Sequence, residues 1–291
     1  MGDPVKASRP ADVGRRRFLL GAGAGAAAAA AGGAGLLTRR AWGRNTSISE
    51  YPLDEAAGPP GGIRLGVQRV IWSVETREPV VALTFDDGPD PQLTPRILDI
   101  LDRYAVTSTF FAMGYSVARH QDLAVEVVAR GHEIGNHTWT HLDLTRQTPD
   151  EVRRQLEMCQ RALQAVAAAP PRYFRPPRGL LSGHATRYAA ESDADIVLWS
   201  VGRGVGGVGT PSAIADHIVG GIERGDIVLL HDGVGRESLR TDLDGPGPIR
   251  RRRAVELEAL PAIIEGILAK GLRPTTVSGL LSAAQTSDEQ R

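Results

Sequence analysis

From about residue 66 onward, short apolar runs alternate with segments of helical periodicity, and this alternation constrains the fold more than any other feature. Residues 80–85 form a nearly continuous apolar run, the composition of a strand that is buried on both faces. Further strands are predicted at residues 107–113, 196–201, 227–230 and 273–277. Repeated strand–helix units predict an α/β fold with a mostly parallel sheet, and the periodicity leaves both an open sheet and a closed barrel open.

Helix start signals separate these strands. Thr94-Pro95 offers an N-cap followed by proline at the first helical position, and Thr210-Pro211 repeats the pattern. Residues 148–151 have the form of a capping box before a further apolar helix face. Other helices are predicted over residues 116–130 and 254–270.

The first 65 residues differ in composition from the rest of the chain. Arg15-Arg16 precedes Phe18-Leu19 and an Ala/Gly/Leu stretch over residues 19–37, which resembles a twin-arginine export signal, although a flexible tail has a similar composition. We expect residues 1–42 to be this signal or an N-terminal anchor and residues 43–65 to be a linker. The twin-arginine machinery would then export the protein to the extracellular space or cell envelope, with membrane contact only through an uncleaved N-terminal segment.

The remaining chain suits one catalytic domain over residues 66–282, followed by a polar tail over residues 283–291. Lys+Arg and Asp+Glu both number 34, so the net charge is zero. Nucleic-acid binders usually carry a basic excess, and we therefore expect no nucleic-acid partner. The only cysteine, Cys159, excludes an intramolecular disulfide and is predicted to be a buried core thiol.

Three clusters of ionisable residues follow predicted strands. Asp86 and Asp87 come before a Gly-Pro turn, His137 and His141 stand four residues apart, and His231 ends a strand. Taken singly, the clusters are also compatible with turn chemistry or with surface histidines. On a helical turn the histidine pair would share one face and suit a metal. Together the clusters contain enough groups for a metal site with an additional base and acid.

Four motifs in this order resemble those of polysaccharide deacetylases with a NodB-homology domain, carbohydrate esterase family 4. They are Phe-Asp-Asp-Gly at 85–88, His-Thr-Trp-Thr-His at 137–141, Arg-Pro-Pro-Arg-Gly at 175–179 and Leu-His-Asp at 230–232. The resemblance covers about residues 66–280. It implies a distorted (β/α) barrel and metal-dependent removal of acetyl groups from N-acetylated sugars of peptidoglycan or a chitin-like polysaccharide.

The resemblance also implies a role for individual residues. One divalent metal ion, expected to be Zn2+, would be held by Asp87, His137 and His141. Asp86 would be the general base, oriented by Arg175, since a nearby guanidinium favours an ionised carboxylate. Without the motifs, Arg175 would instead suggest a surface salt bridge.

Three further roles concern the leaving group and the acetyl group. His231 would be the general acid that protonates the departing amine. The backbone N–H of Arg178 would help to hold the developing oxyanion, and Leu230 would line the pocket for the acetyl methyl group.

Two departures from the family pattern bear on activity. Relatives carry Asp-Trp where this chain has Val205-Gly206, so His231 is expected to lack a supporting carboxylate and activity is expected to fade at lower pH. The insertion at residues 235–253 ends in four arginines, 250–253, and suggests a solvated loop, a lid or a contact for an anionic polymer. Alternatives are therefore an acetyl-ester hydrolase acting on xylan-like polymers and a catalytically weakened carbohydrate-binding protein.

Overall fold

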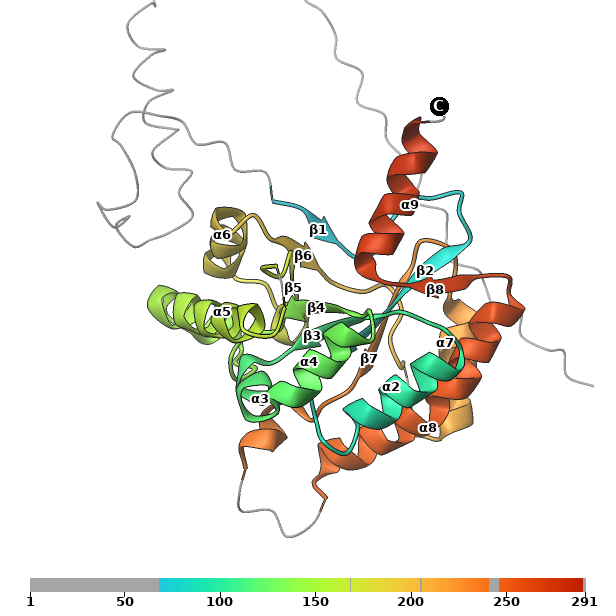
Figure 1. Ribbon diagram of the computed structural model, residues 1–291, viewed down its shortest axis with the longest axis horizontal. Coiled ribbons are helices and arrows are strands. Elements are labelled where there is room, and N and C mark those ends of the chain that lie inside the picture. The colour runs from blue at the N-terminus through green and yellow to red at the C-terminus, as the bar shows by residue number, and fades with distance from the viewer. Residues whose placement is uncertain (1–67, 168, 205, 241–245, 290–291) are drawn as a thin grey trace, which may run out of the picture. The chain divides into compact units, whose positions relative to one another are not determined.

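The computed structural model describes residues 68–289 apart from 168, 205 and 241–245 (Figure 1). The predicted signal, the predicted linker and Val205 lie outside the described residues. Within the described residues, every helix is too short or too polar to cross a bilayer. Residues 283–289, predicted as a polar tail, continue the last helix.

A single parallel sheet contains all eight strands of the described residues, in the order β1-β6-β5-β4-β3-β2-β7, with β8 also paired to β2. The strands are β1 (Val70–Ile71), β2 (Val80–Asp86), β3 (Thr109–Ala112), β4 (Glu133–Asn136), β5 (Tyr173–Phe174), β6 (Asp195–Val197), β7 (Ile227–His231) and β8 (Arg273–Thr275). The chain after β6 returns to β7, where Val201 pairs with Val228. The sheet therefore curls into the predicted distorted (β/α) barrel.

Helices surround this curled sheet, and α7 and α8 lie side by side (Figure 1). The helices are α2 (Thr94–Arg103), α3 (Gly114–Arg119), α4 (Gln121–Ala129), α5 (Pro149–Gln164), α6 (Gly183–Glu191), α7 (Pro211–Gly221), α8 (Pro248–Ala269) and α9 (Val277–Glu289). Short 3-10 turns are η1 (Leu144–Arg146), η2 (Pro177–Gly179) and η3 (Gly235–Leu239).

The predicted helix starts at Thr148 and Thr210 are confirmed by a side-chain cap, whereas the predicted cap Thr94 lies inside α2, which has Leu93 at its N-cap. Thr148 Oγ accepts from the Glu151 N–H at 3.3 Å, and Thr210 Oγ accepts from the Ala213 N–H at 3.2 Å. The predicted helix at 116–130 is two helices instead, because His120 between them has non-helical backbone angles (φ −133°, ψ 52°).

The start of α8 was also predicted wrongly, because α8 begins at Pro248 and its first turns contain the four arginines assigned to a loop. Proline suits a first turn, and the carboxylate of Glu237 accepts the N–H groups of Ile249 and Arg250 at 2.9 and 3.1 Å. The hydrogen-bond acceptor for these N-terminal backbone N–H groups of α8 is therefore a side chain of η3 and not a residue of the helix itself.

Strand alternation separates an outer core from the barrel interior. On β2, Leu83 and Phe85 belong to an apolar cluster that includes residues of α2, α7 and α8. The alternating residues face inward, so Thr84 and Asp86 share a face with His231 on β7. Cys159 on α5 is fully buried, as predicted, and burial raises the pKa of its thiol to about 12.

Candidate metal centre and active site

Asp87, His137 and His141, hereafter the metal centre, bring three potential ligand atoms within 4.8 Å of one another. Asp87 follows β2, and its Oδ1 lies 3.6 Å from His137 Nε2 and 3.3 Å from His141 Nε2. This oxygen is buried and has no hydrogen-bond partner. A cation would satisfy it, and one carboxylate with two imidazoles is a donor set that suits zinc. The residues therefore fit a divalent metal.

A loop presents the two histidines, so the predicted helical turn is wrong. Thr138 and His141 have positive φ angles of 69° and 55°, which an α-helix excludes. Asn136 Oδ1 accepts the Thr138 N–H at 2.9 Å, and Thr138 Oγ1 accepts the His141 N–H at 3.1 Å. These local bonds hold the turn and bring the imidazole rings to a centroid separation of 5.1 Å.

The hydrogen bond made by Nδ1 of His137 determines the tautomer of this imidazole. Its Nδ1 donates to the carbonyl of Arg175 at 2.8 Å, which leaves the Nε2 lone pair directed at the metal centre. Burial lowers the pKa of His141 to about 4, so this imidazole is neutral and able to ligate near neutral pH.

Charge around Asp87 keeps its carboxylate ionised. Burial by itself would favour the neutral acid, but His141, His137 and Arg253 together hold the pKa of Asp87 well below its usual range. For His137, burial opposes the charged form, and Asp86 and Asp87 outweigh it and raise its pKa.

Asp86 is held by Arg175, whose side chain is fully buried. Arg175 Nη1 donates to Asp86 Oδ1 at 2.7 Å and to Thr84 Oγ1 at 2.8 Å, and the guanidinium lies 4.0 Å from the centroid of the Phe111 ring. The other nitrogens donate to the carbonyls of residues 197 and 198 at 3.1 and 2.9 Å. The alternative reading of Arg175 as a surface salt-bridge residue is therefore excluded.

His231 at the end of β7 has a supporting carboxylate, contrary to the sequence-based expectation. Its Nδ1 lies 2.9 Å from Oε2 of Glu256, which is buried on α8. Burial opposes ionisation of Glu256, but His231, Arg253 and Arg203 lower its pKa to about 2. Sequence reasoning missed Glu256, because a glutamate inside a charged helix carries no motif.

Arg250 and Arg253 at the start of α8 bind acids beside the site, and the whole run of four arginines lies on a helix and not in the predicted solvated loop or lid. Arg253 donates to Glu256 Oε1 at 2.9 Å and to Asp87 Oδ2 at 3.2 Å. Arg250 forms a two-nitrogen contact with Asp90, at 3.0 and 2.7 Å. Two of the four arginines in this run thus have their charge matched inside the protein.

The two residues predicted to bind the acetyl group differ in their placement. Arg178 lies in η2 with φ 59°, and its exposed guanidinium pairs with Asp143 at 3.1 Å. Leu230 belongs to the outer core cluster, on the opposite face of β7 from His231. Its predicted place in the acetyl pocket is therefore wrong, because side chains alternate along a strand and Leu229 shares the face of His231.

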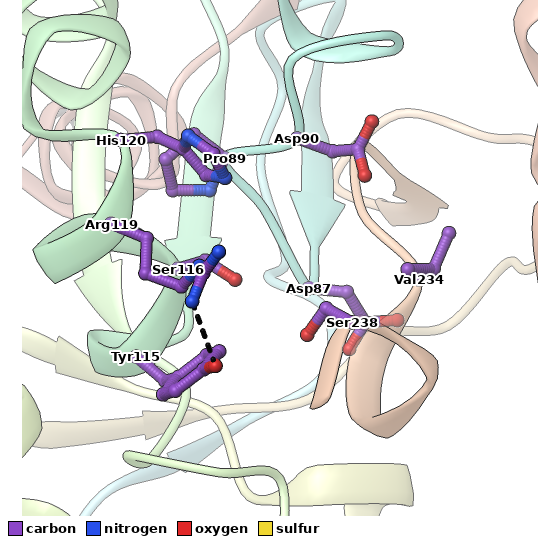
Figure 2. A pocket seen from close by; sticks show the side chains of 9 residues that line it. All are labelled: Asp87, Pro89, Asp90, Tyr115, Ser116, Arg119, His120, Val234 and Ser238. Atoms are coloured by element: carbon purple, nitrogen blue, oxygen red, sulfur yellow. Dashed lines mark hydrogen bonds between the residues drawn. The ribbon is translucent and has the colours of Figure 1, made fainter. Parts of the chain in front are cut away.

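A small polar pocket of about 30 Å³ lies beside Asp87 (Figure 2). Tyr115 and Arg119 from α3 lie on one side of it and Asp87 and Ser238 on the other, as Figure 2 shows, and Arg119 Nη1 donates to Tyr115 Oη at 3.3 Å. The volume suits roughly two water molecules rather than a sugar ring. The pocket therefore borders the metal centre.

Comparison with known proteins identifies the family. The polysaccharide deacetylase profile matches residues 73–197. A peptidoglycan-N-acetylglucosamine deacetylase of Bacillus cereus is 35% identical over 214 residues, covering 73% of this chain and 92% of that protein. A chitooligosaccharide deacetylase of a Bradyrhizobium species is 37% identical over 63% of this chain and 90% of that protein.

A solved structure agrees with this assignment at the level of the fold. The crystal structure of a peptidoglycan N-acetylglucosamine deacetylase superimposes with a TM-score of 0.63 and 30% identity. The superposition covers 72% of this chain and 92% of that one. With relatives matched over almost their whole length and a shared barrel, this chain belongs to the polysaccharide deacetylase family of hydrolases.

Proposed function

We propose that this protein is a metal-dependent hydrolase that removes acetyl groups from N-acetylated sugars of peptidoglycan or a chitin-like polymer. The observation that carries the proposal is the orphaned, buried Oδ1 of Asp87 between two histidines, with Asp86 and His231 beside it. The name of the Bacillus cereus relative supports N-acetylglucosamine as the sugar, and the name of the Bradyrhizobium relative supports a chitooligosaccharide substrate.

Asp87, His137 and His141 would hold the metal, for which we propose Zn2+. When bound, such an ion supplies Lewis-acid activation of a water molecule and of the amide carbonyl. The position of His137 supports this assignment, because its hydrogen bond to a backbone carbonyl orients the ring as in many metal-binding histidines.

Asp86 would act as the general base. Its Oδ1 is occupied by Arg175, so Oδ2 is the oxygen that can take a proton from the attacking water. The buried guanidinium fixes the orientation of this carboxylate. The water oxygen then bonds to the carbonyl carbon, and the backbone N–H of Arg178 would stabilise the oxyanion.

His231 would act as the general acid. Its Nδ1–H donates to Glu256, so the doubly protonated imidazolium carries its second proton on Nε2 and delivers that proton to the sugar nitrogen as the C–N bond breaks. The products are acetate and a free amino sugar. Leu229, on the same strand face, replaces Leu230 as the residue proposed to line the acetyl pocket.

The proposed place of action is outside the cytoplasm, in the extracellular space or cell envelope. Arg15-Arg16 and the following apolar stretch support export by the twin-arginine machinery, and only an uncleaved N-terminal segment would contact the membrane.

Acetate release from peptidoglycan, chitooligosaccharides and acetylated xylan tests the function, with and without a chelator and zinc restoration. We expect release from the N-acetylated polymers alone, loss with the chelator, and recovery with zinc. Preferential release from xylan would favour an acetyl-ester hydrolase, and binding without release would favour a carbohydrate-binding protein.

A further inference from the structure

The carboxylate beside His231 comes from a part of the chain unrelated to the four motifs. Glu256 lies on α8, 25 residues after His231, and its side chain is 1% exposed. The Oε2–Nδ1 distance of 2.9 Å is that of a good hydrogen bond. A neutral His231 must therefore donate its Nδ1 proton to Glu256.

Two arginines surround the same carboxylate. Arg253 Nη1 lies 2.9 Å and Arg203 Nε 3.5 Å from Glu256 Oε1, and both guanidinium side chains are about one-tenth exposed or less. A buried carboxylate persists as an anion when cations and hydrogen bonds compensate for its lost hydration. Oε1 of Glu256 therefore contacts the two arginines, while Oε2 of Glu256 accepts the hydrogen bond from His231.

Arg203 also explains why an acid from α8 suits this site. It lies in the segment after β6, and its Nη1 donates to the carbonyl of Gly207 at 3.3 Å. This segment supplies a cation that contacts Glu256, so the anion beside His231 comes from α8 and the segment after β6 helps to hold it.

Arg253 connects the acid side of the site to the metal centre. One guanidinium nitrogen contacts Glu256 and another contacts Asp87 Oδ2, so His231, Glu256, Arg253 and Asp87 form a continuous chain of charged contacts. Loss of the Glu256 charge would leave His231 without its orienting acceptor and leave both arginines without their shared anion.

We propose that Glu256 is the positioning residue for His231, a relocated replacement for the aspartate that this chain lacks at Val205-Gly206. This inference rests on the proposed function, in which His231 is the general acid. Glu256 accepts the Nδ1–H bond and fixes the ring plane, so that the Nε2–H of the imidazolium faces the sugar nitrogen. Its side chain contacts His231, Arg253 and Arg203.

The test compares two substrates that differ in their need for an acid. Amine departure from an N-acetylated chitooligosaccharide requires a proton, whereas 4-nitrophenolate leaves 4-nitrophenyl acetate without one. For Glu256→Gln we expect kcat for the amide to fall about 100-fold or more, since general acids contribute 10²–10⁴-fold. The ratio of amide to ester kcat should fall with it, with little change in KM and with zinc content retained.

Matched variants separate this role from a structural one. Glu258→Gln alters an exposed glutamate of the same helix and should keep the wild-type ratio. Glu256→Asp keeps the charge but shortens the reach, and we expect it to restore part of the amide rate. A merely structural Glu256 would lower both rates together, and that result would overturn the inference.

Two further results identify which hypothesis fails. His231→Ala should reproduce the substrate selectivity of Glu256→Gln, and unimpaired amide hydrolysis by His231→Ala would refute the proposed acid itself. A loss with His231→Ala but not with Glu256→Gln would refute only the positioning role. If Glu256→Gln does not fold, 15N NMR of the histidine rings in Glu256→Asp and wild type decides the matter: an Nδ1–H tautomer of His231 is expected, and an Nε2–H tautomer refutes the inference.

Discussion

Replacing Arg175 with methionine is the perturbation whose consequence follows most directly from the buried contacts. The variant retains a long apolar side chain but removes the guanidinium that pairs with Asp86, whose side chain is 5% exposed. It also removes the donors for Thr84 Oγ1 and for two backbone carbonyls. Breaking a buried ion pair on one side lowers the free energy of unfolding by about 3–5 kcal/mol.

Most of this loss should come from the charge left behind on Asp86. The double variant Arg175→Met/Asp86→Asn removes both charges, so its loss should be smaller than the sum of the two single losses by at least about 1 kcal/mol. Equilibrium urea denaturation of the metal-free proteins, followed by circular dichroism, gives the four free energies of this cycle. Working without metal keeps changes in metal affinity out of the comparison.

Arg172 provides the control, because it is exposed and lies three residues before Arg175. Arg172→Met should change the free energy of unfolding by no more than about 0.5 kcal/mol. A loss below about 1 kcal/mol for Arg175→Met, or strict additivity in the double variant, would show that the buried pair does not hold the base as argued. Amide hydrolysis by Arg175→Met should also fall, since Asp86 loses its orientation.

The remaining predictions concern the metal, export and the buried acid. Alanine at either histidine of the metal centre should lower the zinc content measured by mass spectrometry. Asp86→Asn should keep zinc and abolish turnover. If Asp86→Asn lost zinc and Asp87→Asn kept it, the assigned roles of base and metal ligand would be reversed between the two aspartates. Lysine at both Arg15 and Arg16 should block export while preserving charge, and undiminished export would indicate the general secretory route. The pKa of Glu256 is lowered to about 2, so its ionised form should stabilise the protein above about pH 4.5, and this contribution should be lost as the pH falls toward 2. The difference in unfolding free energy between wild type and Glu256→Gln should therefore shrink from pH 6 to pH 3.5, and a constant difference would contradict the assignment.

The sequence by itself determined the class of fold and the location of most of the chemistry. The apolar run before Asp86 and the apolar residues before His231 identify two strands, and neighbouring parallel strands place their carboxyl ends at one edge of a sheet. Register then sets Asp86 directly opposite His231. Helix starts at Thr148 and Thr210 were predictable for the same reason: the capping bonds involve residues only three positions apart.

Local pattern was insufficient wherever a contact depends on residues distant in the chain. The four-residue spacing of His137 and His141 is compatible with a helix, but bonds from Asn136 and Thr138 hold a loop. The start of α8 depends on a carboxylate from η3, which periodicity cannot reveal.

The support for His231 was decided only by the tertiary structure. The family pattern indicated a missing carboxylate, because a motif records which residue occupies a position and not which side chain arrives there from elsewhere. Glu256 reaches His231 because α8 packs against the outer face of the sheet with Leu257 and Leu260 in the core, which turns the preceding acid toward the end of β7. The contact between Glu256 and His231 therefore depends on how the domain packs. The sequence around Glu256 or around His231 does not indicate that the two side chains meet.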